Sequence, residues 1–312
     1  MSDRAALEAV VAAQFDREVS AGARALAEAA RLRCPGTLAV VFYGSCLRVA
    51  GDSDGVLDLY VLVDAYETTY DRRLLVWLNR MLPPNVFFLS VQSEGITVRA
   101  KYAVVTLSSF VSYMADSTRE SYFWGRFAQP SAVVYAASPE VVRTLARGLA
   151  TAVETFTRNA LALVPPTFSA RELWVEGLSE SYDTELRAEG PDRSAELFDR
   201  FAEYYDAATP LALAAMPFPV TREGAGWTVA MPSAERARRL REWRKRRVYS
   251  KLLTVLRILR NAYTVDGGPE YVMWKIERHG EFRFDKDWRS KPVPLLALAR
   301  EVWRAWRAGA FR

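Results

Sequence analysis

The sequence predicts an α+β fold, in which a small mixed sheet with helices comes first and a mainly helical region follows. Apolar runs of strand length, rich in β-branched and aromatic residues, lie at 37–45, 55–64, 85–92 and 96–107. From residue 108 onward, apolar residues recur mostly at helical spacing. Half of the 312 residues are hydrophobic and a quarter are charged, which is typical of globular proteins with a sizeable core.

Helices are expected around and after these strands. One or two amphipathic helices occupy 1–32, ahead of the Pro35-Gly36 pair, and another covers 70–82 ahead of Pro83-Pro84. Further helical patterns cover 108–127, 138–163 and 170–206, whereas 215–233 is rich in proline and glycine and is expected to be a linker or loop. We therefore divide the chain into a sheet domain at 1–107, a helical domain at 108–214, and a linker with a basic helical region at 215–312.

Charge and cysteine content limit the possible functions. The formal net charge of +5, carried mostly by arginine, favours anionic partners, although the arginine-heavy usage of a GC-rich genome gives the same bias. Two cysteines argue against a disulfide framework, and a single histidine, His279, argues against a histidine metal site. No apolar run is long enough to span a membrane and no signal peptide is evident, so a cytoplasmic location is expected.

The segment VVFYGSCLRVAGDSDGVLDLYVLVD, residues 40–64, places a Gly44-Ser45 turn after one strand and Asp58 inside the next. This arrangement resembles the DNA polymerase beta-type nucleotidyltransferase superfamily. Glycine lets the backbone approach a triphosphate closely, and a strand carboxylate can hold a divalent metal ion. A second carboxylate usually stands two positions later, but Tyr60 occupies that position here.

Further segments resemble the mitochondrial translocator-maintenance family of phosphatidate cytidylyltransferases, the peripheral CDP-diacylglycerol synthases. That family also has the Tyr43-Gly44-Ser45 turn and an apolar residue at the position of Tyr60. AKYAVVTL (100–107), SYFWGRFAQP (121–130) and PPTFSARELWVEGLSESYDTELR (165–187) resemble its later motifs, in order. Four positions depart from the family pattern: Gln129 replaces a lysine, Glu180 a tyrosine and Glu185 an arginine, and Arg187 comes two residues late.

The resemblance implies a nucleotidyltransferase-type sheet and transfer of CMP from CTP to phosphatidate, with Mg²⁺ as cofactor. It makes Asp58 the principal metal ligand and Lys101 a contact to the triphosphate. Tyr43, Gly44 and Ser45 would hold the nucleotide phosphates. Arg126 would clamp a phosphate of the nucleotide or lipid, and Asp183 would complete the metal or ribose site. A second metal ligand could come from Asp52, Asp54 or Glu94, or from substrate phosphates and water.

Each of these residues also has a structural interpretation. Asp58 could be a strand acid paired with a nearby arginine or a turn amide, and Gly44-Ser45 an ordinary turn. Lys101 could be a solvated strand lysine, Arg126 an interdomain ion pair, and Asp183 a helix-surface acid. Two other functions stay open: a nucleotidyltransferase with RNA, a sugar phosphate or a protein hydroxyl as acceptor, and a non-catalytic nucleotide-binding or scaffold protein. No motif indicates nucleic-acid binding.

Two C-terminal segments bear on a lipid acceptor. In YSKLLTVLRILRNAY, residues 249–263, apolar residues recur at helical spacing after a basic run. Such a basic amphipathic helix can lie on an anionic membrane, but we expect its apolar residues to face the core and its arginines to lie on the solvated face. The last segment, 294–312, combines tryptophans with arginines, and we expect it to contact an anionic membrane surface. The sequence thus predicts a peripheral protein on the inner face of a membrane.

Overall fold

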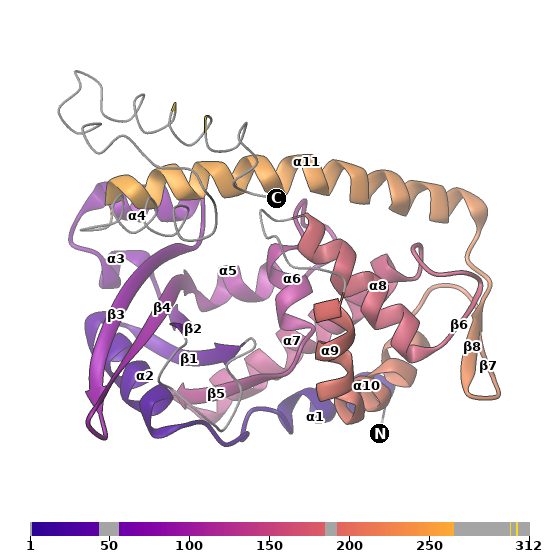
Figure 1. Ribbon diagram of the computed structural model, residues 1–312, viewed down its shortest axis with the longest axis horizontal. Coiled ribbons are helices and arrows are strands. Elements are labelled where there is room, and N and C mark those ends of the chain that lie inside the picture. The colour runs from indigo at the N-terminus through magenta and orange to yellow at the C-terminus, as the bar shows by residue number, and fades with distance from the viewer. Residues whose placement is uncertain (1, 44–55, 185–191, 265–299, 301–303, 305–312) are drawn as a thin grey trace.

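The computed structural model describes residues 2–43, 56–184, 192–264, 300 and 304 of the chain, and within these ranges the fold is mixed α+β, as predicted. Five strands form the main sheet in the spatial order β3-β4-β2-β1-β5 (Figure 1). β2 and β4 run parallel, and the other neighbours run antiparallel. The strands are β1 (Thr37–Tyr43), β2 (Val56–Val63), β3 (Asn85–Ser93), β4 (Ile96–Thr106) and β5 (Ser131–Ala136).

Helices precede the sheet, connect its strands and build the other half of the molecule. They are α1 (Asp3–Ala12), α2 (Ala21–Arg33), α3 (Tyr66–Thr69), α4 (Arg73–Met81), α5 (Leu107–Ser112), α6 (Tyr122–Phe127), α7 (Pro139–Ala160), α8 (Ala170–Asp183), α9 (Asp192–Arg200), α10 (Ala202–Ala214) and α11 (Ser233–Thr264). Serine caps start several of them; Ser169, for example, forms a capping box with Glu172.

The sheet is covered on both faces, which explains why β2 is apolar along most of its length. Alternate side chains of β2 point to opposite faces. Leu59 and Val61 pack in one cluster with Leu26 of α2. Tyr60 and Leu62 pack in a second cluster, which continues through α6 and α7 into the helical half.

Three segments differ from the predicted elements. The predicted helix at 108–127 is two short helices, α5 and α6, with the chain between them in turns and bends. β5 lies in the region assigned to the helical domain, between the helical patterns at 108–127 and 138–163, and pairs with β1, because an edge strand can be short and find its partner far away in the sequence. Within the predicted linker at 215–233, β7 (Val220–Glu223) and β8 (Gly226–Val229) form a hairpin, which β6 (Thr167–Phe168) joins.

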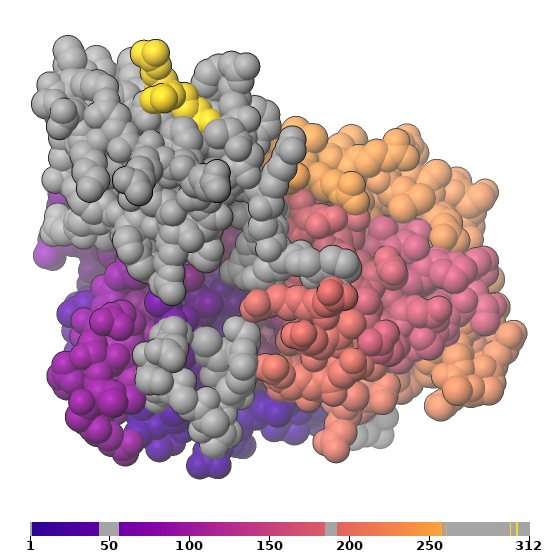
Figure 2. Space-filling model, in the orientation of Figure 1, coloured from indigo at the N-terminus to yellow at the C-terminus, as the bar shows by residue number. Residues whose placement is uncertain are grey.

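The long helix α11 lies along the outside of both halves, from above α4 to the β7–β8 hairpin (Figure 1). In Figure 2 its orange surface forms the outer edge above the helical half. The expected orientation of its side chains was wrong: Leu252 and Leu256 are 56% and 42% exposed. Buried arginines face the body of the protein instead, at 239, 246, 257 and 260. No helix in the described ranges is both long and apolar enough to cross a membrane.

Backbone carbonyls and carboxylates explain why these arginines can be buried. Arg260 donates to the carbonyl oxygens of Leu82 and Pro84. Arg257 donates to the carbonyl oxygen of Pro83 at 2.8 Å and forms two hydrogen bonds with Glu120. Because a guanidinium has five donors, it can hold several acceptors that an apolar side chain would leave unsatisfied.

Asn159 of α7 is the centre of a second group of contacts to α11. Its side chain is fully buried. Its Oδ1 accepts from Arg246 at 2.7 Å and from Arg239 at 3.2 Å, and its Nδ2 donates to Asp116 at 2.9 Å. The Trp243 ring nitrogen donates to its backbone oxygen at 3.1 Å. Burial opposes charge on Asp116, but the hydrogen bonds from Arg239 and Asn159 outweigh it and lower the pKa of the carboxyl.

We expect Asn159→Leu to lower the free energy of unfolding by about 3 kcal/mol or more, because it removes the acceptor of two buried guanidinium groups. Asn79 of α4 is the matched control, since it is also fully buried but donates to the Tyr70 hydroxyl and holds no arginine. Asn79→Leu should cost about 1 kcal/mol. Urea denaturation of both variants measures the difference, and equal losses would contradict the role given to Asn159.

Candidate functional site

Asp58 lies in the middle of three neighbouring strands, near the end of the sheet where β1 stops. Tyr43, the last residue of β1, pairs in register with Asp58, and Asp58 pairs in register with Lys101 of β4. Side chains in register on adjacent strands project from the same face of a sheet. Asp58, Lys101 and Tyr43 therefore lie on the same face of the sheet as Tyr60, the face that packs against the helical half.

Lys101 is the partner of the strand acid. Its Nζ lies 3.2 Å from Oδ1 of Asp58, and the two side chains are 24% and 28% exposed. Asp58 is tolerated in an apolar strand because it stands near the start of β2, where water and a cation reach it; from Leu59 onward the strand is buried. An ammonium group has three donors, so Lys101 retains hydrogen-bonding capacity for a second anion.

Tyr60, at the position of the usual second carboxylate, belongs to the aromatic core. Its ring lies 5.0 Å from the Phe127 ring and 5.3 Å from the Tyr43 ring, and its hydroxyl donates to the Tyr122 hydroxyl at 3.2 Å. Burial raises the pKa of Tyr60 well above its usual value, so the phenol stays protonated at neutral pH. A protonated phenol is a poor metal ligand, and Tyr60 therefore does not replace the missing carboxylate.

Tyr122 of α6 connects this core to two arginines. The guanidinium of Arg126 lies 3.7 Å from the centre of the Tyr122 ring, and that of Arg257 lies 4.6 Å from it. Arg126 is 4% exposed and donates to the Tyr122 backbone oxygen at 2.9 Å. Its charge acts on Tyr60 in the direction that lowers the phenol pKa, which places it near the same face of the sheet. The sequence motif included Tyr122 without a role, and nothing in the sequence pointed to Arg257.

Among the described residues, no hydrogen bond or ion pair joins Asp183 to Asp58. It is the last residue of α8 and is exposed. Its charge acts instead on Arg247 of α11 and helps to raise the pKa of that guanidinium, after the stronger effect of the Glu180 hydrogen bond. The geometry thus supports a helix-surface acid at this position more than a metal ligand.

Two departures from the family pattern have structural partners. Gln129 is buried; its side chain accepts from the Tyr182 hydroxyl at 3.2 Å and donates to the Gly125 oxygen at 2.9 Å. Glu180 forms two hydrogen bonds with Arg247 of α11. Both side chains therefore hold helices together in this protein.

Among the described residues, Asp58 is the carboxylate that this site offers to a metal ion. No group of three or more metal-ligating side chains occurs in the part of the chain that the structure describes. Asp58 fits a magnesium site of the kind that uses one or two carboxylates, with substrate phosphates and water as the other ligands. Glu94 stands in the turn between β3 and β4, beyond Val56, the first residue of β2. Gly44, Ser45, Asp52 and Asp54 lie outside the described residues.

The candidate site is therefore the Asp58–Lys101 pair beside Tyr43, with Arg126, the buried Tyr60 and the half-buried Tyr122 behind it. The pair combines a carboxylate with a cation on adjacent strands, at the point where the chain enters the Gly44-Ser45 segment. Such an arrangement suits a metal-bound polyphosphate, since the carboxylate can hold a cation and the ammonium group can contact a phosphate oxygen. In comparison with known proteins, no family model matches this chain and no curated protein matches it significantly.

Proposed function

We propose that this protein is a nucleotidyltransferase that transfers CMP from CTP to phosphatidate, giving CDP-diacylglycerol and pyrophosphate. One observation carries the proposal: Asp58 and Lys101 form a partly exposed ion pair on adjacent strands, beside the residue that precedes Gly44-Ser45. The resemblance of the 40–64, 100–107 and 121–130 segments to the cytidylyltransferase family supports the choice of nucleotide and acceptor.

The reaction needs little help from a general base, because the lipid phosphate is already an anion. One of its oxygens attacks the α-phosphorus of CTP and forms a new P–O bond, while the bond to the oxygen shared with the β-phosphate breaks and pyrophosphate leaves. Asp58 would hold Mg²⁺, which neutralises charge on the triphosphate. Lys101 would orient the triphosphate through the donors that Asp58 leaves available, so catalysis rests on positioning and charge.

A diacylated acceptor requires the protein to work at a membrane surface, and we place it on the cytoplasmic face as a peripheral protein. The expected docking segment, 294–312, lies outside the described residues. On α11, the exposed side chains of Val248, Leu252 and Leu256 follow the exposed Arg244 and Lys245 along the helix. Exposed apolar residues next to basic ones suit an anionic bilayer surface, which supports a peripheral contact.

The second candidate is a protein that binds a nucleotide without turnover. The burial of Tyr60 where a second carboxylate usually stands favours it. A turnover assay with CTP, Mg²⁺ and phosphatidate vesicles, following both pyrophosphate and lipid product, separates the two. Pyrophosphate release with a different acceptor, such as a sugar phosphate, would keep the nucleotidyltransferase and replace the lipid.

We expect Asp58→Asn to reduce turnover by about a thousandfold, because the metal-binding charge is lost while the side-chain shape is kept. Folding should change little, since the ion pair with Lys101 is partly exposed. Asp71→Asn, at an exposed acid outside the site, is the control. Steady-state rates with a thermal melt of each variant make the test, and near-normal turnover in a folded Asp58→Asn protein would refute the site.

Tyr60→Phe should keep turnover within about fivefold of the wild type, because the phenol is buried and its loss removes a hydrogen bond to Tyr122 and no metal ligand. The same assay measures it. A loss as large as that of Asp58→Asn would mean that the Tyr60 hydroxyl takes part in the chemistry.

CTP should compete for the nucleotide site more strongly than ATP or GTP. The reason is the resemblance to cytidylyltransferases, so this prediction tests the family directly. Displacement of labelled CTP by each unlabelled nucleotide, in the presence of Mg²⁺, gives the order. If ATP displaces the label equally well or better, the cytidylyl assignment fails while the nucleotidyltransferase assignment stands.

A further inference from the structure

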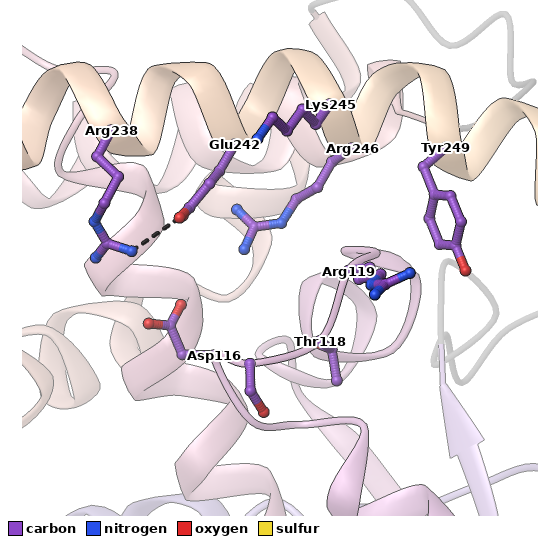
Figure 3. Close-up of a pocket in the computed structure, with 9 residues that line it drawn as sticks. Asp116, Thr118, Arg119, Arg238, Glu242, Lys245, Arg246 and Tyr249 are labelled. Atoms are coloured by element: carbon purple, nitrogen blue, oxygen red, sulfur yellow. Dashed lines mark hydrogen bonds and ion pairs between the residues drawn. The ribbon is translucent and has the colours of Figure 1, made fainter.

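A cavity of about 600 Å³ separates α11 from the loop that joins α5 and α6. Residues 116–119 of the loop line one side, and the pocket-facing side chains of α11 line the other. Figure 3 shows the guanidinium of Arg246 between the helix and the loop that carries Arg119, with the Tyr249 ring hanging from α11 toward the same loop. None of the residues proposed for the nucleotide site lines this cavity.

The charges around the cavity are unequal. Four basic and two acidic side chains line it. Both acids already have basic partners: Glu242 pairs with Arg238 at 2.9 Å, and Asp116 pairs with Arg239 at 2.6 Å. In the described part of the chain, by contrast, no carboxylate oxygen lies within 4.0 Å of the side-chain nitrogens of the three other cations, Arg119, Lys245 and Arg246.

Among these three cations, Arg246 gives the strongest indication of an anion-binding site. It is 4% exposed, and its guanidinium lies 5.4 Å from the ring centres of both Trp124 and Trp243. One of its donors reaches Asn159, a neutral acceptor, at 2.7 Å. Burial lowers its pKa, which means that the charged form is held in a site where it is poorly solvated. A desolvated cation at the wall of a cavity gains most from an anion that enters it.

We propose that this cavity binds a phosphate monoester, with Arg119, Lys245 and Arg246 around its dianionic group. Three cations on two elements suit a group with three terminal oxygens better than they suit a planar carboxylate. The volume suits a small molecule or the headgroup of a larger one. On α11, Leu252 and Leu256 continue the row of Lys245 and Tyr249 at helical spacing, so the ester could be free or part of a lipid.

Calorimetric titration of the full chain with glycerol 3-phosphate, and with glycerol as a blank, tests the proposal. The Arg119→Gln/Lys245→Gln double variant should weaken binding by about tenfold or more, since both side chains are exposed and their charge is the attraction removed. Arg73→Gln/Arg200→Gln removes the same charge from exposed positions on α4 and α9, outside the cavity and away from the basic and apolar face of α11, and it should change binding by less than about twofold.

A vesicle flotation experiment shows whether the bound phosphate group belongs to a free ester or to a lipid. Phosphatidylcholine vesicles with and without phosphatidate are tested against the same variants. Saturable binding of glycerol 3-phosphate supports a free ester. Binding to phosphatidate vesicles alone supports a lipid headgroup, provided that the Arg119→Gln/Lys245→Gln variant loses it. If neither glycerol 3-phosphate nor phosphatidate vesicles bind, or if the cavity variant and the control variant lose binding equally, the proposal is overturned. Asp58→Asn should leave this binding unchanged, so failure here and failure of the nucleotide site are distinguishable.

Discussion

The attachment of α11 through buried arginines is the interaction on which the rest of the structure depends. Arg257 and Arg260 bind the carbonyls of residues 82–84 beside the sheet, and Arg239 and Arg246 bind Asn159 in the helical half. The helix has 32 residues and is therefore about 48 Å long, so it reaches both halves. It also forms one wall of the basic cavity and supplies a cation to the Tyr122 ring. Hydrogen bonds of the buried arginines, together with the buried Trp243 ring, thus decide which face of α11 turns inward.

The candidate nucleotide site depends on a different constraint, the register of the sheet. Parallel pairing of β2 with β4 sets Lys101 beside Asp58, and antiparallel pairing of β1 with β2 sets Tyr43 on the other side. A shift of one residue in either pairing would turn a charged side chain toward the α2 face, where Leu57 and Leu59 are packed. The apolar alternation that holds the sheet together therefore also positions the charges.

The sequence predicted those parts of the fold that depend on neighbouring residues in the chain. The α+β class and the first four strands followed from apolar periodicity and from the glycine and proline residues between runs. The pairing of Asp58 with Lys101 was beyond the sequence, because two residues far apart in the chain meet only through strand order. The short strand β5 was missed for the same reason. The burial of Arg246 and Arg257 was missed because an arginine in a helix is usually solvated, and its acceptors here, Asn159 and the Pro83 carbonyl, lie far away in the chain. The roles of Gly44, Ser45 and the 294–312 segment remain predictions.

The contact between Arg257 and Pro83 has a consequence for the order of folding. The two residues are separated by 174 positions in the chain. A ribosome that adds about 5–20 residues per second finishes the sheet strands well before the α11 arginines emerge. Until then, water takes the place of the α11 arginines as hydrogen-bond partner of the carbonyls at 82–84 and of the Glu120 carboxylate. Closure of such a long loop is entropically costly and slow compared with local helix formation, so α11 is expected to dock last, onto two halves that have already formed.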